Sequence, residues 1–90
     1  MLVLPAELTH EHAAACCRML ESGLRNDPAG SVVADASPLQ RFDSSALSVL
    51  LACRREALVL GKTFSVKSLP PRLRTLAGLY GVADLLPAAP

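Results

Sequence analysis

The sequence predicts an α/β fold in which short strands alternate with helices along a single domain, residues 1–90. Three short apolar runs, at residues 2–8, 31–36 and 63–67, have the composition of strands. Each run is followed by a segment with apolar residues at helical spacing. This β-α-β-α-β-α order favours right-handed crossovers, and therefore a small, mostly parallel sheet packed against helices. A chain of 90 residues has room for one such domain.

The first strand is predicted at Leu2–Leu8. Pro5 has no amide hydrogen to donate, so this strand should be irregular or lie at a sheet edge. Thr9 is predicted to cap the first helix, with Glu11 in its first turn, where a negative charge is favourable. A cluster of turn-forming residues at 26–30 ends this helix. Its buried face is predicted to consist of Ala13, Cys17, Leu20 and Leu24.

The second helix is predicted to begin at Asp43-Ser44-Ser45 and to reach Leu60. Gly61 follows it, and glycine is favoured just past a helix end because left-handed backbone costs it little. At helical spacing its apolar residues form two stripes that are separated by Arg54. The broad stripe consists of Ala46, Val49, Leu50, Cys53, Ala57 and Leu60, and the narrow stripe of Leu47, Leu51 and Leu58.

The narrow stripe of the second helix has two interpretations. A small surface helix normally has one apolar face, so a second stripe is either covered by the rest of the core or available to a partner. The sequence leaves both open. In the partner interpretation Arg54 and Arg55 would form a charged rim around an apolar centre.

The last part of the chain predicts a third helix. Ser68 is expected to cap it, and the two prolines that follow are tolerated in a first helical turn. Gly81 ends the helix, residues 82–87 pack as a short apolar piece, and residues 88–90 are expected to form a loose tail. The apolar face of this helix is predicted to consist of Leu69, Leu73, Leu76 and Tyr80.

Composition and charge exclude several classes of protein. The formal net charge is +1, with three Arg against six acidic residues in 1–44 and six basic against two acidic residues in 45–90. Three aromatic residues and no dense basic patch argue against a nucleic-acid partner. The basic half is expected to face an acidic protein surface, an anionic membrane surface or solvent. No run approaches the roughly 20 apolar residues of a membrane span, and no signal peptide is recognisable, so we expect a cytoplasmic protein.

The residues that most often carry chemistry form no catalytic pattern. Cys16, Cys17 and Cys53 lack the spacing of a zinc site or a disulfide framework, and we expect them to be reduced. On a helix His10 and His12 would point to different sides. There is no phosphate-binding glycine loop and no nucleophile with a nearby base. We therefore expect no enzymatic activity, no metal and no cofactor.

The most informative polar residues lie where the second strand ends and the second helix begins. Asp35 ends the strand, and Asp43-Ser44-Ser45 opens the helix. The simplest interpretation is capping, in which Asp43 or Ser44 accepts hydrogen bonds from first-turn amides. The functional interpretation is a hydroxyl displayed at the positive end of a helix, which favours a phosphate or an anionic group of a partner.

The element order and the Asp43-Ser44-Ser45 helix start together resemble the STAS domain of anti-sigma factor antagonists and sulfate transporter tails. The step from Asp35 to Asp43 is similar to the spacing between the strand aspartate and the helix-start aspartate in that family. Residues 69–87, with Thr-Leu-Ala-Gly-Leu-Tyr-Gly at 75–81, resemble the MlaB branch of the family. The resemblance covers residues 2–87 and implies a STAS-like sandwich.

The MlaB resemblance implies a non-catalytic subunit that binds and supports or regulates the MlaF-like ATPase of a phospholipid-transport ABC complex. Such a complex contains an inner-membrane permease and acts in outer-membrane lipid asymmetry. The subunit itself would be cytoplasmic and peripheral to the complex. The residues expected to contact the ATPase are Ser44, Ser45, Leu47, Leu51, Arg55, Arg74 and Tyr80.

Two departures from the family pattern leave an alternative open. STAS domains generally begin with an additional strand, which is missing or shortened here and would leave a sheet edge with less cover. Ala46 stands where a glycine commonly follows the hydroxyl residues. The phosphorylated serine of the antagonists corresponds to Ser45, and the hydroxyl residue of MlaB to Ser44. The alternative is therefore an anti-sigma factor antagonist switched by phosphorylation at Ser45, with Ser44 as the second candidate for modification.

Overall fold

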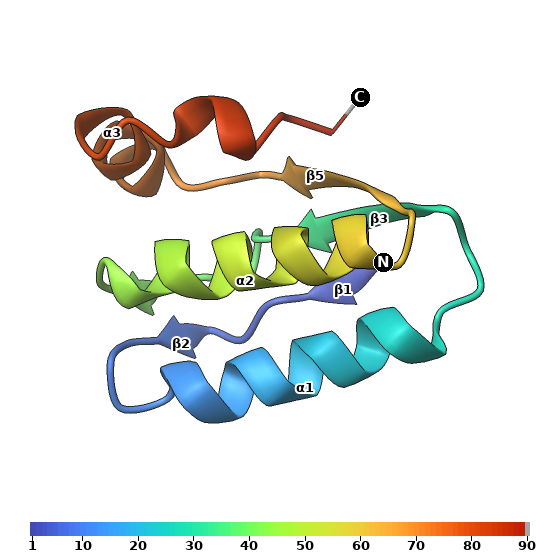
Figure 1. Cartoon of the computed structure of the whole chain (residues 1–90). Helices are drawn as coiled ribbons and strands as arrows, with labels where there is room; N and C mark the ends of the chain where they lie inside the picture. The colour runs from blue at the N-terminus through green and yellow to red at the C-terminus, as the bar shows by residue number, and fades with distance from the viewer. Residues whose placement is uncertain (90) are drawn as a thin grey trace.

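The computed structural model describes residues 1–89 and has the predicted alternation of strands and helices (Figure 1). The second helix and the third strand of the prediction lie where they were expected, and the first helix ends where it was expected. The elements in chain order are β1 (Leu2–Val3), β2 (Glu7–Leu8), α1 (Ala13–Asn26), β3 (Ser31–Asp35), β4 (Arg41–Phe42), α2 (Ser45–Val59), β5 (Thr63–Lys67), α3 (Pro71–Leu79) and the 3₁₀ helix η1 (Ala83–Leu85).

The strands pair in parallel, as the alternation with helices predicts. β3 is the central strand of a sheet with the order β1-β3-β5, in which Leu2 is opposite Ala34 and Ser31 is opposite Thr63. β2 and β4 form a second parallel pair, with Glu7 opposite Arg41. The α/β sandwich expected of a STAS-like domain is therefore confirmed.

The first predicted strand is interrupted at its proline. β1 and β2 are separated by residues 4–6, where Pro5 has no amide hydrogen to donate, and β1 is an edge strand of the sheet. The carbonyl oxygen of Ala6 accepts hydrogen bonds from the amides of Gln40 and Arg41, at 2.8 and 3.0 Å. These bonds lead into the β2–β4 pair. The segment that becomes β4 was expected to be a loop, because two residues carry no alternating pattern.

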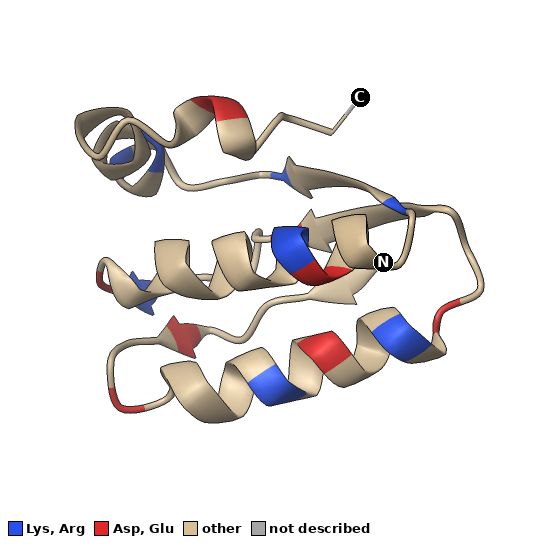
Figure 2. Ribbon diagram, in the orientation of Figure 1, with Lys and Arg blue, Asp and Glu red and all other residues tan. Residues whose placement is uncertain are grey.

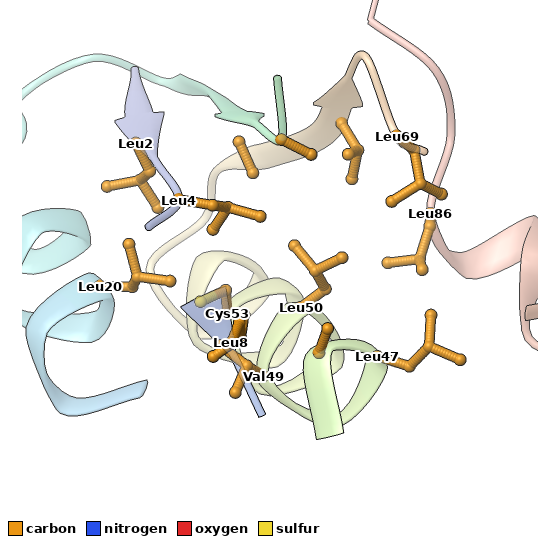
Figure 3. Close-up of a cluster of buried hydrophobic side chains, with 14 of the residues drawn as sticks. Leu2, Leu4, Leu8, Leu20, Leu47, Val49, Leu50, Cys53, Leu69 and Leu86 are labelled. Atoms are coloured by element: carbon orange, nitrogen blue, oxygen red, sulfur yellow. The ribbon is translucent and has the colours of Figure 1, made fainter. Parts of the chain in front are cut away.

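The helices cover one face of the sheet and enclose the core with it. In Figure 3, α1, α2 and the segment around η1 lie on the same side of the strands. Alternate residues of β3 and β5 point into this core, whereas Val33 and Ser65 of the other face are only half-buried. The largest side chains buried to below 2% exposure are Leu4, Leu8, Leu24, Leu50, Leu73, Leu86, Val32, Val66 and Cys53.

Helix α1 begins three residues later than the capping signal indicated. His12, and not Thr9, occupies the N-cap position, because residues 10–12 form a turn in which the His12 amide donates to the Thr9 carbonyl at 3.0 Å. Glu11 lies in this turn and not in the helix. Cys16 lies in the core beside Leu20 and Leu24, whereas Cys17, which the sequence assigned to the buried face, is half-buried.

The ends of the other helices test the remaining capping predictions. Gly61 and Gly81 have φ angles of +74° and +72°, as expected of glycines that follow a helix. Ser68 does not cap α3: its φ is +59°, and Pro70 occupies the N-cap position without a side-chain hydrogen bond. The two prolines do lie at the start of the helix, as predicted.

The tail was expected to be loose, and for its described residues this is wrong. The amide of Val66 donates to the carbonyl of Pro87 at 2.8 Å, and the amide of Ala89 donates back to the carbonyl of Val66 at 2.9 Å. Ala88 bridges Val66 in parallel, so this segment lies along β5 on the side away from β3. These backbone hydrogen bonds to the edge of β5 hold the segment in place, and an Ala-rich sequence gives no sign of them. Pro90 lies outside the described residues.

Candidate partner-binding groove

Asp43 fixes the start of α2. One carboxylate oxygen accepts the amide of Ser45 at 2.8 Å, and the other accepts the amide of His10 at 3.0 Å. These bonds from His10 and Ser45 hold the pKa of Asp43 below its usual value, because they stabilise the ionised carboxylate. The capping prediction is thus met by Asp43, while the N-cap residue Ser44 has an exposed side chain and makes no cap hydrogen bond within residues 1–89.

Asp35 has a comparable local function at the end of β3. Its carboxylate accepts the amide of Ser37 at 3.0 Å, which shapes the turn into residues 36–40. Hydrogen bonding from Ser37 lowers the pKa of Asp35. Asp35 therefore holds the turn after β3 and Asp43 holds the start of α2. The side chain of Ser44 is exposed, and that of Ser45 is half-buried.

One part of the narrow stripe of α2 is covered by the core, and the other part is exposed and available to a partner. Leu47 is 3% exposed and belongs to the core, and Figure 3 shows it extending from α2 toward the side where Leu86 lies. Leu51 is half-buried, and Leu58 is 51% exposed. Leu47, at the start of the stripe, is covered because the chain from α3 to η1 passes beside it. Leu58, at the other end, is not covered.

Two adjoining pockets lie along the uncovered side of α2, and together we call them the α2 groove. The N-terminal pocket has a volume of about 240 Å³ and is lined by Ser44, Leu47, Ser48, Leu51, Tyr80 and Val82. The C-terminal pocket has a volume of about 440 Å³ and is lined by Leu51, Arg54, Arg55, Leu58, Val59 and Leu85. Leu51 lines both pockets, so they adjoin at this residue.

The groove collects most of the residues that the sequence singled out for partner binding. Tyr80, which the sequence also assigned to the apolar face of the third helix, is not buried there: it is 61% exposed at the C-cap of α3, where the helix has ended. Two predicted residues lie outside it: Ser45 is half-buried in the first turn of α2, and Arg74 is exposed on α3. The predicted residues that line the groove are Ser44, Leu47, Leu51, Arg55 and Tyr80.

Sequence reasoning missed the opposite wall of the groove. Val82 and Leu85 belong to a segment that was predicted only as a short apolar piece, because periodicity does not reveal which helix such a piece packs against. Arg54 was expected at the rim and does line the C-terminal pocket. Leu58 already belonged to the narrow stripe of the prediction, whereas Val59, the last residue of α2, was not singled out.

A separate polar pocket lies next to the N-terminal end of α2. His10 and His12 both line it, although helical spacing had placed them on different sides, because the residues around them form a turn and not a helix. Asp43 also lines this pocket. Within residues 1–89 no group of three His, Cys, Asp or Glu side chains is placed to hold a metal ion.

The three thiols are shielded. Cys16 and Cys53 are buried and Cys17 is half-buried, and none of them is in a disulfide. Burial raises the pKa of Cys53 to about 12. Burial and a hydrogen bond from the Cys17 thiol to Glu21, at 2.8 Å, raise the pKa of Cys17 to about 11. At neutral pH these thiols are protonated and behave as small apolar groups.

A small parallel sheet with helices on one face, together with an Asp-Ser-Ser start of the helix that bears the groove, defines a STAS-type domain. A family profile described as "Mlab, STAS domain" matches residues 1–87, and the chain belongs to this family. No curated protein matches the chain. No helix among residues 1–89 is both long enough and apolar enough to cross a membrane.

Proposed function

We propose that this protein is the non-catalytic STAS subunit of an Mla-type phospholipid-transport ABC complex, and that its α2 groove binds the ATPase subunit. The subunit would support or regulate the ATPase on the cytoplasmic face of the inner membrane, next to the permease, and so serve outer-membrane lipid asymmetry. Family membership supports the STAS subunit, and the groove supports the docking site. The nucleotide would belong to the ATPase.

The observation that carries this proposal is an apolar groove on the helix that follows the family motif. Leu51, Leu58 and Tyr80 leave apolar surface in contact with water, which burial against a partner would remove at about 25 cal/mol per Å². Exposed apolar patches with a polar border are typical of sites of protein association.

The position of the two serines favours the MlaB-like subunit over the anti-sigma factor antagonist. Ser44 lines the N-terminal pocket together with Leu51 and Tyr80, whereas Ser45 lies outside it with its amide bonded to Asp43. Ser44 is the hydroxyl that a partner in the groove would meet.

Co-purification with the ATPase subunit tests the proposal. We expect Leu51→Asp and Leu58→Asp to abolish assembly, since each places a charge in the apolar groove. Met19→Asp is the matched control, because Met19 is 57% exposed on α1 and does not line the groove. Full assembly of both groove variants would refute docking through α2, and the exposed position of Leu58 keeps the test valid should Leu51→Asp unfold the domain.

The antagonist alternative has its own measurement. After incubation with a candidate serine kinase, a phosphorylated chain would gain the mass of one phosphate, and Ser45→Ala would not gain it. We expect no such gain in the wild-type protein, and a Ser45-dependent gain that releases a bound partner would favour the antagonist instead.

A further inference from the structure

We infer that the C-terminal pocket of the α2 groove takes a helical segment of the ATPase that carries two or more apolar side chains next to a carboxylate. The inference rests on the proposed function, since the occupant is taken to be part of the ATPase. It adds the chemistry by which that segment would be recognised, and it concerns the half of the groove that lies away from the serine motif.

The floor of this pocket is apolar and exposed. Leu58 is 51% exposed, Val59 is 75% exposed and Leu85 is 37% exposed. Three large apolar side chains around one cavity of about 440 Å³ leave room for apolar side chains of a second element. The pocket runs along one side of α2, and a helix can place residues at i, i+3 and i+4 along such a groove.

The rim of the pocket carries positive charge without a local counterion. Arg54 and Arg55 line it, no acidic side chain does, and the three ion pairs among residues 1–89 include neither arginine. Figure 2 shows the charged residues of α2 gathered in its C-terminal half. The acidic residue next to them, Glu56, is 3.7 Å from Arg25 of α1 and is engaged on the other side of α2.

A carboxylate is the group that this rim would recognise. A guanidinium presents a planar set of donors that matches the two oxygens of a carboxylate, and partial exclusion of water strengthens such a pair. Opposite charges at the border of an apolar contact contribute mainly to specificity and to the rate of association. An apolar helix that carries Asp or Glu at its edge complements both the apolar floor and the positively charged rim of the pocket.

Charge reversal at the rim tests the inference with full-length protein and purified ATPase. We expect Arg55→Glu to raise the dissociation constant by about tenfold or more, while Arg18→Glu, an exposed arginine of α1 that does not line the groove, leaves it unchanged. Wild-type binding should weaken between about 50 mM and about 500 mM salt, and binding of Arg55→Glu should lose this dependence. Equal circular dichroism spectra and thermal midpoints establish that both variants are folded.

The outcomes separate the inference from the proposed function. If Leu58→Asp abolishes binding but Arg55→Glu binds as the wild type does, the ATPase occupies the groove, and the inference that the arginine rim recognises a carboxylate is wrong. If the wild-type chain binds no ATPase, both are overturned. If the chain instead forms a dimer that Arg55→Glu dissociates, the occupant is a second copy of the chain and the inference is overturned. In the supporting case, Arg55→Lys still binds, and a carbodiimide couples its amine to an Asp or Glu of the ATPase.

Discussion

At the scale of single residues, Asp43 has a structural function that the motif alone does not reveal. Its two oxygens hold the first amide of α2 and the amide of His10, so one side chain ties a helix start to the loop between β2 and α1. The sequence predicted the helix contact, because an aspartate next to a helix start is a familiar cap. The sequence could not predict the contact with His10, since this contact depends on the tertiary arrangement that brings the loop before α1 next to the start of α2.

This double contact makes the stability of the domain depend on pH. The pKa of Asp43 is lower in the folded chain than its ordinary value of 3.8, so the unfolded chain binds more protons in acid. Its contribution is therefore complete above that ordinary value and is lost as the pH falls through the lowered pKa. Asp27 and Asp35 have lowered pKa values as well, from hydrogen bonds with Ala29 and Ser37, and add in the same direction.

We expect Asp43→Asn to lower the urea midpoint at neutral pH, because an amide oxygen can replace only one of the two carboxylate acceptors. The difference from the wild type should shrink as the pH falls below 3.8 and through the lowered pKa of Asp43, where the wild-type carboxyl also becomes protonated. Glu11→Gln is the control, because Glu11 lines the same polar pocket but accepts no hydrogen bond within residues 1–89. A deficit that is constant across this pH range would contradict the assignment to the ionised carboxylate.

The cysteines yield a second prediction at this scale. Raised pKa values and burial should make the native protein react slowly with Ellman's reagent at pH 7.5, because the thiolate is the reacting form. In denaturant all three thiols should react at once. One rapidly reacting thiol in the folded protein would show that α1 and α2 open more easily than their packing suggests.

At the scale of elements, the broad apolar stripe of α2 was predictable and its limits were not. Ala46, Val49, Leu50, Cys53 and Ala57 are buried as the helical spacing indicated. Leu60, assigned to the same stripe, is 41% exposed, because the helix ends at Val59 and the direction of the chain changes. Periodicity identifies a face, whereas the extent of cover along it depends on the neighbouring elements.

Two leucines of α2 test this division. Leu50 is fully buried, so Leu50→Ala should lower the free energy of unfolding by about 2–5 kcal/mol through lost burial and a cavity. Leu58→Ala removes the same atoms from a half-exposed site and should change it by about 0.5 kcal/mol or less. Urea titrations of both variants measure the difference, and comparable losses would mean that the outer side of α2 is covered.

At the scale of the whole molecule, the sequence predicted the class of fold and most of one wall of the groove. Alternating strands and helices determine a parallel sheet through general rules of connection, and the structure has that sheet. The second wall was predicted only at Tyr80, because the positions of Val82 and Leu85 depend on tertiary packing of a segment with little periodicity. The contacts that close the far edge of β5 likewise involve residues without a strand pattern.

The closed edge of β5 is testable through one amide. Ala89→Pro removes the donor to the Val66 carbonyl and should lower the free energy of unfolding by about 1 kcal/mol, the typical value of one hydrogen bond. Ala88→Ser keeps every backbone donor and is the control. Equal stability of the two variants would mean that the segment does not stay on the strand in solution.

The parallel pairing of every strand also has a consequence for the path of folding. Leu2 meets Ala34 and Ser31 meets Thr63, so a whole helix must be traversed before either pair can form. No hairpin is available to nucleate the sheet locally, and loop closure comes before any gain from strand contacts. We therefore expect refolding to be slower than that of a helical bundle of equal length. The helices should form before β3 has paired with both β1 and β5.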